Sequence, residues 1–212
     1  MTPLEQQIEA IREHLVAKNR SRETALGLAR ETIRTAANAI RALHRHDFET
    51  AERLSGEAGR ALAAASAALA DHPDILHAGF VHDAAKEYAE SRLALALVRG
   101  DALPDPAGIG VDQVAFLHGL AESVGELRRH LLDYLRRGEV DRCEPLLERM
   151  DEIYSQLVTI DFPDAMTGGL RRSTDSVRGI LEKTRGDLTV AIRQRDLESR
   201  LGEFEQRLRG SP

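Results

Sequence analysis

Apolar and polar residues recur with a helical period along almost the whole chain. Between residues 111 and 137, leucine and valine return every three or four positions, which places them on one side of a helix. Glycine, proline and short polar turns divide this pattern into segments. The pattern predicts six helices, over residues 4–46, 48–70, 73–99, 111–137, 139–160 and 170–208.

Helix breakers locate most of the predicted ends. Pro73 fits the first turn of a helix, and Gly138 fits the residue that follows one. The stretch 100–110 contains three glycines and two prolines, so it is expected to be a loop. Ser21 stands where it would cap a new helix, and the first helix is therefore expected to be interrupted near residues 19–21.

The composition favours an all-α fold. The chain has 212 residues, of which 29 are alanine, and only 4% are aromatic. Alanine, leucine, arginine and glutamate favour helices, while residues that favour strands are scarce, which argues against all-β and doubly wound folds. We expect one all-helical domain over residues 1–212, a bundle of six to seven helices. Its helices would pack on alanine and leucine or bury apolar surface between subunits, so we expect an oligomer.

No segment has the pattern of a membrane-spanning helix or of a signal peptide. The longest run of small apolar residues, 61–70, is about half of the roughly 20 residues that a bilayer requires. The N-terminus carries charges where a signal peptide has an apolar centre. A single cysteine, Cys143, excludes an internal disulfide. These features favour a cytoplasmic protein with no membrane partner.

The net charge of −6 conceals a basic region near the N-terminus. Residues 1–46 contain eight lysines and arginines against five acids, a charge of +3, so residues 47–212 carry −9. A row of guanidinium groups suits the phosphates of a nucleic-acid backbone. At about 100° per residue, four arginines fall on one face of the first predicted helix: Arg30, Arg34, Arg41 and Arg45.

Two interpretations of this arginine face remain. It is either a nucleic-acid surface or a solvated face with acidic partners on a neighbouring helix. Residues 20–46 hold six arginines and two acids, so pairs within the helix cannot neutralise it. No aromatic side chains accompany the arginines, which favours contacts with the backbone of a single strand over stacking on its bases. His72, His77 and His82 could add to such a surface.

The third predicted helix holds two carboxylates in apolar surroundings. Its apolar residues leave no wide polar face, so the helix should be buried. Glu87 and Glu90 lie in its middle, about 60° apart. Buried carboxylates require a paired cation or a metal ion, and two neighbouring ones repel each other. The sequence leaves open whether Arg92 and Lys86 pair with them or a metal ion does.

The fourth predicted helix carries a second pair, Glu122 and Glu126, about 40° apart. Its apolar stripe lies almost opposite, so both would ordinarily belong to a solvated face. They would join the first pair only if that face lined a cleft next to the third helix. Gly119 and Gly125 suggest such an approach, because glycine inside a helix costs about 1 kcal/mol relative to alanine.

Together these glutamates offer only hard oxygen ligands, which suit Mg²⁺ or Mn²⁺. A di-iron bundle would add Glu-x-x-His pairs, and neither helix has one. The sequence therefore favours a magnesium or manganese site over a di-iron site.

Three segments resemble the translin/TRAX family, whose members bind single-stranded RNA and DNA. They are ETIRTAANAIRALHR on the first helix, KEYAES at 86–91 and GLAESVGEL at 119–127. Their order and spacing agree with the family along nearly the whole chain. The resemblance implies a seven-helix fold, assembly into a closed octameric shell, and nucleic-acid-binding surfaces inside that shell.

The TRAX-type subunits of this family are Mg²⁺-dependent endoribonucleases, while translin-type subunits lack the full acidic set. Glu87 and Glu90 match the family's E-Y-x-E pattern, and Glu122 and Glu126 match its second acidic pair. Glu122 departs from the pattern, which has aspartate there, so its carboxylate reaches one methylene further. The resemblance implies that these four glutamates are metal ligands and catalytic residues, and that Arg30, Arg34, Arg41 and Arg45 bind the strand.

The leading hypothesis is a homo-octamer that binds single-stranded RNA and cleaves it by metal-activated hydrolysis of phosphodiester bonds, with single-stranded DNA as a second ligand. The alternative is a non-catalytic shell that binds single-stranded nucleic acid. A third hypothesis is a structural helical protein with no nucleic-acid role. All three share the features described, so a cleavage assay is needed to separate the first two.

Overall fold

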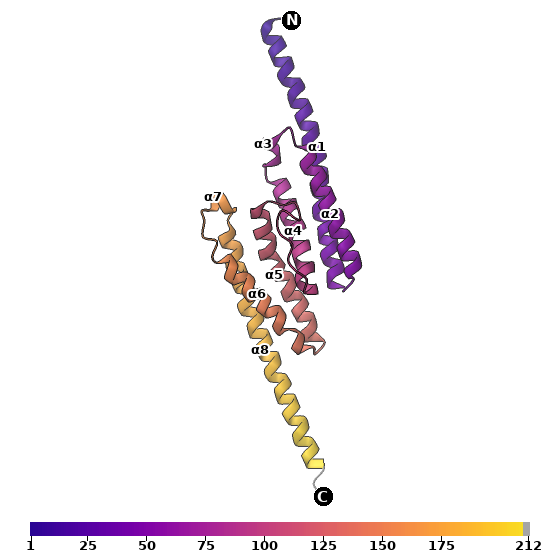
Figure 1. The fold of residues 1–212 in the computed structure, drawn as a ribbon, viewed down its shortest axis with the longest axis vertical. Coiled ribbons are helices and arrows are strands. Elements are labelled where there is room, and N and C mark those ends of the chain that lie inside the picture. Colours follow the sequence, from indigo (N-terminus) through magenta and orange to yellow (C-terminus); the bar gives the residue numbers. More distant parts are fainter. Residues whose placement is uncertain (210–212) are drawn as a thin grey trace. The chain divides into compact units, whose positions relative to one another are not determined.

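The computed structural model describes residues 1–209, and every regular element within that range is a helix. A 3-10 turn at Val140–Arg142 lies between α5 and α6. The all-α prediction is confirmed. The helices are α1 (Pro3–His44), α2 (Phe48–Ala68), α3 (Pro73–Leu76), α4 (Phe80–Arg99), α5 (Gln113–Arg136), α6 (Glu144–Leu157), α7 (Asp164–Thr167) and α8 (Leu170–Arg209) (Figure 1).

The chain divides into two compact units, and the division falls within α5. The first unit, Met1–Leu120, contains α1 to α4 and the beginning of α5. The second begins at Ala121 and contains the rest of α5 together with α6, α7 and α8. Each unit buries apolar residues of its own.

In the first unit, α1 packs along α2 and α4 (Figure 1). Small side chains let helices approach closely, and Ser55 Oγ of α2 lies 2.9 Å from Ser91 Oγ of α4 in the interior. The core therefore packs on small aliphatic residues, as the aromatic-poor composition predicts. Its main members are Ala25, Ala29 and Ala36 of α1, Ala58, Leu62 and Ala65 of α2, and Ala84 and Ala85 of α4.

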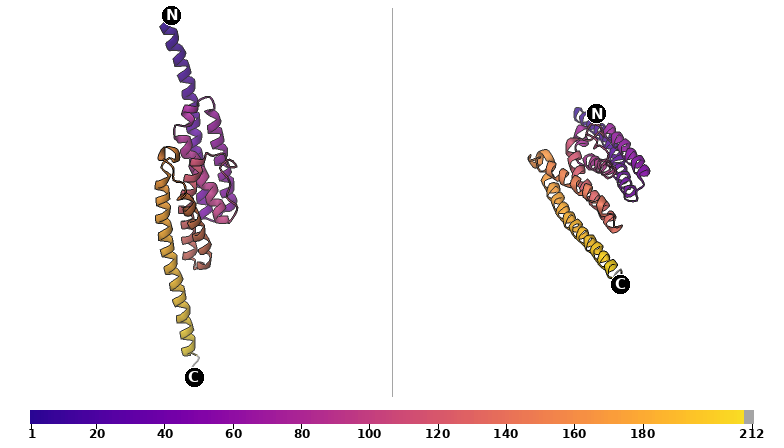
Figure 2. Two further views of the ribbon diagram at one scale, coloured as in Figure 1. Left: turned by 60° about the vertical axis from the view of Figure 1, so that its left-hand side comes forward. Right: turned by 60° about the horizontal axis from the view of Figure 1, so that its bottom comes forward.

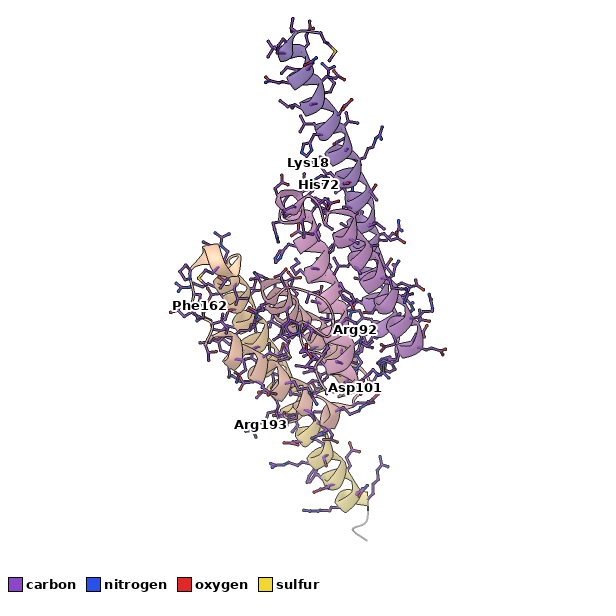
Figure 3. The ribbon with its side chains drawn as sticks, turned by 45° about the horizontal axis from the view of Figure 1, so that its top comes forward. Lys18, His72, Arg92, Asp101, Phe162 and Arg193 are labelled. Carbon is purple, nitrogen blue, oxygen red and sulfur yellow. The ribbon has the colours of Figure 1, made fainter. Side chains whose placement is uncertain are left out.

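Helix α1 runs without a break, so the interruption expected near residues 19–21 is wrong. Thr24 continues the helix, and its Oγ1 donates to the carbonyl oxygen of Arg20 at 3.0 Å. Lys18 forms an ion pair with Asp74, and Figure 3 shows it close to His72 at the start of α3. The N-terminal part of α1 extends past the end of α2 (Figures 1 and 2).

The segment predicted as one helix over 73–99 is two helices. Helix α3 ends at Leu76 and α4 begins at Phe80. Gly79, at the start of α4, has φ +96°, a conformation that favours glycine. The break separates α3 from α4, the helix that carries Glu87 and Glu90.

The helix predicted over 139–160 is also shorter than expected. Gly138, with φ +77°, ends α5 as predicted, but a 3-10 turn follows it before α6 begins at Glu144. Pro145 lies in the first turn of α6, where its missing N–H costs no hydrogen bond. The segment between the predicted helices 139–160 and 170–208 contains the single turn α7.

In the second unit, α6 packs against α8. Arg128 of α5 donates to Thr184 Oγ1 at 2.8 Å and to Asp187 Oδ2 at 2.7 Å, both on α8. The C-terminal half of α8 continues beyond α6 (Figure 2). None of the helices in the described residues combines the length and hydropathy needed to span a bilayer.

Candidate functional site

Helix α4 is buried on most of its surface, as its apolar sequence predicts. Glu90 lies among these buried positions and is only 8% exposed, while Glu87, one turn earlier, is partly exposed. Withdrawing a carboxylate from water is costly unless a cation accompanies it. The position of Glu90 therefore calls for a positive charge nearby.

Gly119 brings α5 against α4 beside Glu90. A Cβ atom built on Gly119 would lie 2.8 Å from the backbone nitrogen of Glu90 and 2.8 Å from Cβ of Ala89, closer than real Cβ atoms come. Only glycine allows the two helices to approach at this point. Gly125 has no atom within 4 Å of such a Cβ, so the close approach is confirmed at Gly119 and is wrong at Gly125.

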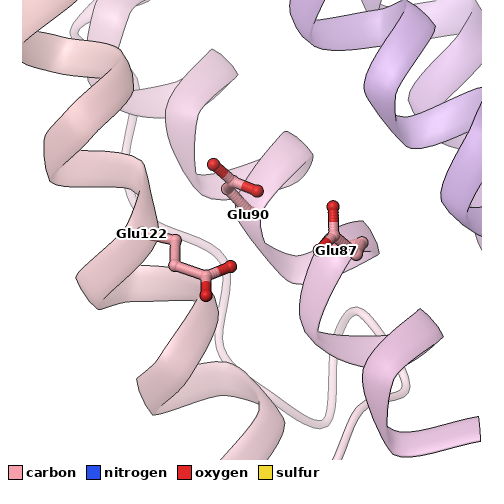
Figure 4. A group of neighbouring side chains, drawn as sticks. All are labelled: Glu87, Glu90 and Glu122. Atoms are coloured by element: carbon pink, nitrogen blue, oxygen red, sulfur yellow. The ribbon is translucent and has the colours of Figure 1, made fainter. Parts of the chain in front are cut away.

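Glu122 follows Gly119 by one turn of α5 and reaches the glutamates of α4. The carboxylates of Glu87, Glu90 and Glu122 each offer an oxygen, and these oxygens all lie within 4.8 Å of one another (Figure 4). We call these three residues the carboxylate cluster. Glu126, one turn further along α5 and partly exposed, falls outside this group.

Arg92 and Lys86, which the sequence offers as partners for the glutamates of α4, lie in different places. Arg92 donates to Glu52 of α2 at 2.7 Å, and Arg99 donates to the other oxygen of Glu52 at 3.0 Å. Lys86 lies at the cluster itself, with its Nζ 3.5 Å from Glu87 Oε1. The ammonium group of Lys86 therefore offsets part of the negative charge of the cluster.

The chemistry of the cluster fits a hard divalent cation. All three side chains are carboxylates, and no cysteine or histidine belongs to the group found among the described residues. Oxygen ligands of this kind suit Mg²⁺ or Mn²⁺, and a dication would relieve the repulsion between like charges. The donor set is therefore suitable for the magnesium or manganese ion expected from the sequence.

A second polar group lies where α5 begins. Asp112 Oδ1 accepts hydrogen bonds from the N–H groups of Val114 and Ala115, both at 2.9 Å, and its Oδ2 lies 3.3 Å from Nδ1 of His82. Partial burial opposes ionisation, but the hydrogen bonds from Ala115 and His82 hold the pKa of Asp112 below its ordinary value. His118, which is 9% exposed, places its ring 6.4 Å from that of His82.

Only one member of this group, His82, is predicted from the sequence, as an addition to a nucleic-acid surface. Asp112 and His118 are not predicted. The available signal is Asp112 at the start of the fourth predicted helix, where an aspartate commonly accepts hydrogen bonds from the first turn. His72 is partly buried beside His14, and His77 is exposed.

The arginine face lies on the outer side of α1. Its four members are exposed, and they lie opposite the alanines that pack against α2 and α4. Arg41 donates to Oδ1 of Asn38 at 2.6 Å. The pKa of Asp47, which caps α2, lies below its ordinary value because of its hydrogen bond with Thr50, and the positive charge of Arg45 contributes to this shift. A neighbouring helix therefore provides an acidic group near one end of the arginine face, and both interpretations of the face remain.

Cys143 does not contribute to a reactive site. Its side chain is fully buried, and burial raises the pKa of the thiol to about 11. The thiol is protonated at neutral pH, which makes it a poor nucleophile and a poor metal ligand. The chemistry of the chain is therefore expected from its carboxylates.

No model of a protein family matches the sequence, but individual proteins and solved structures do. The uncharacterized protein MJ0175 of Methanocaldococcus jannaschii is 30% identical over 192 residues, which are 89% of this chain and 84% of that protein. The crystal structure of AfC3PO, from Archaeoglobus, is 31% identical, with a TM-score of 0.82 over 89% of this chain and 98% of its own.

Two further structures share the fold. AfC3PO in a complex with duplex RNA is 30% identical, with a TM-score of 0.82 and the same coverage of both chains. The apo structure of NeC3PO, from Neurospora, is 19% identical, with a TM-score of 0.76 over 90% of this chain and 98% of its own. At that identity, the Neurospora structure supports the fold alone.

Proposed function

Because the chain belongs to the translin/TRAX family, which includes these C3PO proteins, we propose that it binds RNA and cleaves it as a Mg²⁺-dependent endoribonuclease. The observation that carries this proposal is the carboxylate cluster. Three like charges within 4.8 Å of one another repel, and a bound cation would account for their proximity.

Glu87, Glu90 and Glu122 would hold the cation, and Glu126 is proposed as a further ligand from the next turn of α5. When bound, the ion supplies Lewis-acid chemistry that activates water and offsets charge on the phosphoryl oxygens. The protein would position these ligands: Glu90 belongs to the buried helix α4, and Gly119, one turn before Glu122, packs against that helix. Preorganised ligands of this kind keep the reacting groups in place.

The arginine face would hold the strand by its phosphates. AfC3PO has been crystallised with duplex RNA, which supports RNA as the ligand of this chain. We propose single-stranded RNA as the substrate, with single-stranded DNA as a second ligand, because the exposed arginines lack aromatic partners for stacking. Binding through phosphates should weaken steeply as salt rises.

Exposed apolar residues support assembly of several copies. On α1, before the contact with α2, four aliphatic side chains are about half exposed or more, and α8 has a second such group near its end. Surface of this kind usually marks a protein interface. We propose a homo-octamer in which other copies cover these residues, which are Leu4, Ile8, Ile11 and Leu15 of α1 and Leu197, Leu201 and Phe204 of α8.

A cleavage assay tests the proposal. Labelled single-stranded RNA, duplex RNA and single-stranded DNA are each incubated with the protein in Mg²⁺ and in EDTA. Products from single-stranded RNA should appear only with Mg²⁺. The double variant Glu87→Gln/Glu90→Gln should lower kcat/KM by at least about 100-fold, because the cation loses two ligands, while RNA affinity is retained.

The same assay tests the alternative function, a shell that binds without cleaving. That function is favoured if the RNA stays intact in Mg²⁺ while binding weakens as salt rises. Loss of RNA binding together with cleavage in the double variant would instead indicate that the two glutamates maintain the fold.

A further inference from the structure

Lys86 is an unusual choice of residue at the carboxylate cluster. The chain contains 29 basic residues, and only three are lysines: Lys18, Lys86 and Lys183. Lysine carries a compact charge on a flexible stem, whereas arginine holds a carboxylate with a rigid planar fork. At this position the chain therefore has the cation that can leave its partner most easily.

Lys86 is placed at the crossing of α4 and α5. Its carbonyl oxygen would lie 3.0 Å from a Cβ built on Gly119, so its backbone belongs to the contact between the helices. Its ammonium group lies 3.5 Å from Oε1 of Glu87, and the two side chains are 24% and 30% exposed. Both side chains therefore keep some contact with solvent beside the cluster.

The charges of the cluster set up a competition. In their ionised forms the three carboxylates would carry a formal charge of −3, which the ammonium of Lys86 reduces to −2. A dication in the cluster would bind the same carboxylate group of Glu87, and it would repel an ammonium held a few ångströms away. Either cation therefore weakens the binding of the other.

We propose that Lys86 is the counter-ion of the cluster in the metal-free protein and moves to a phosphate of the bound strand when a divalent cation occupies Glu87. This inference rests on the proposed function, because it requires both a cation and a strand at the cluster. The released ammonium would then offset the charge of the phosphate next to the carboxylates. Lys86 is thus a group that binds substrate in the loaded site and stabilises the empty one.

The variant Lys86→Met keeps the length of the side chain and removes its charge. Three effects are expected: metal binding becomes tighter, cleavage becomes slower, and the metal-free protein becomes less stable. Mn²⁺ should bind about tenfold more tightly, because the competing cation is gone, while cleavage at saturating metal should slow by about tenfold. The metal-free protein should melt at a temperature lower by about 3 °C, because the carboxylates lose their counter-ion.

The measurements are Mn²⁺ titration followed by electron paramagnetic resonance, thermal melting in EDTA, and single-turnover RNA cleavage. Lys183→Met is the matched control, because Lys183 is an exposed lysine of α8, and it should leave all three unchanged. Lys86→Gln provides a second neutral variant if Lys86→Met does not fold.

Unchanged or weaker Mn²⁺ binding in both neutral variants would overturn the proposal. So would tighter binding with cleavage at the parental rate, because Lys86 would then have no role at the phosphate. If the unmodified protein does not cleave RNA at all, the proposed function fails, whereas the titration and the melting still decide whether Lys86 is the counter-ion.

Discussion

Gly119 is the residue on which the contact between Glu90 and α5 depends. Inside a helix, glycine is less favourable than alanine, so a neutral position would be expected to hold another residue. Here the backbone of α4 occupies the space that a Cβ would need. The same α5 helix contains Gly125, which has no such neighbour and therefore provides an internal comparison.

We predict that Gly119→Ala lowers the free energy of unfolding by about 2 kcal/mol, because its methyl group overlaps the backbone of α4. Gly125→Ala should raise the free energy of unfolding by about 0.5 kcal/mol, since alanine favours the helix and meets no atom. Urea denaturation of the two variants measures both values. Equal stability of the two would show that α5 does not press against α4 at Gly119.

Glu126 is the acidic residue for which the family pattern and the observed cluster give different indications. The pattern makes it a catalytic ligand, whereas the three clustered carboxylates do not include it. We predict that Glu126→Ala lowers cleavage by at least about tenfold. Its melting temperature should stay near the parental value, because the side chain is partly exposed. Cleavage at the parental rate would remove Glu126 from the catalytic account.

The candidate site shows where prediction from sequence stops. A helical wheel places Glu87 and Glu90 in a buried helix, and Glu90 is indeed buried. The same wheel puts Glu122 opposite the apolar stripe of α5, which by itself indicates solvent. Its approach to Glu90 depends on which helix packs at Gly119, and no local pattern contains that information.

At the scale of elements, α1 separates two kinds of surface on one helix. Its inner face consists of alanines that pack against α2 and α4, and its outer face carries the four arginines. Small residues inside keep the helix close to the core, while the arginines keep their charge in water. The element therefore joins the core of the first unit to the proposed RNA-binding surface.

The double variant Arg34→Ala/Arg41→Ala should weaken RNA binding and reduce the slope of log K against log salt by about 1.4, because two phosphate contacts are lost on a single strand. Binding assays at several salt concentrations measure this slope. Arg136→Ala is the control, since Arg136 is an exposed arginine of α5 that pairs with Asp133. An unchanged slope in the double variant would favour a structural protein without a nucleic-acid role.

Most helices could be predicted because their apolar residues recur with the helical period over many turns. The positions of the breaks instead depend on competing local interactions. Ser21 has the chemistry of a helix cap, but the continuous helix α1 keeps its backbone hydrogen bonds and the cap is not used. Gly79 breaks a segment whose apolar residues otherwise continue as a helix. Apolar residues recur on both sides of Pro145, so the pattern does not show that α6 begins only at Glu144. In each case the outcome depends on packing that the residue itself does not specify.

At the scale of the whole molecule, the proposed assembly rests on apolar residues that the chain leaves exposed. Ile8 and Ile11 are 48% and 54% exposed on the part of α1 that extends past α2. Their burial by another copy would supply the favourable free energy that a stable oligomer requires. Symmetric, closed assemblies are the usual way for identical chains to bury such surface.

Native mass spectrometry should therefore find eight copies for the unmodified protein. The variant Ile8→Glu/Ile11→Glu should give smaller species, because two charges would have to be buried at the interface. Gln6→Glu, on an exposed polar position of the same helix, should leave the assembly intact. A monomer for the unmodified protein would contradict the octamer.

The burial of Cys143 also makes the chain easy to label. Its thiol is the only one in 212 residues, and at neutral pH it is both inaccessible and protonated, so maleimide reagents should leave the natural protein almost unmodified. A cysteine introduced at an exposed position beside the arginine face, such as Glu31→Cys, would then be the one reactive thiol. A fluorophore attached there would report the arrival of a strand in real time, without prior removal of Cys143.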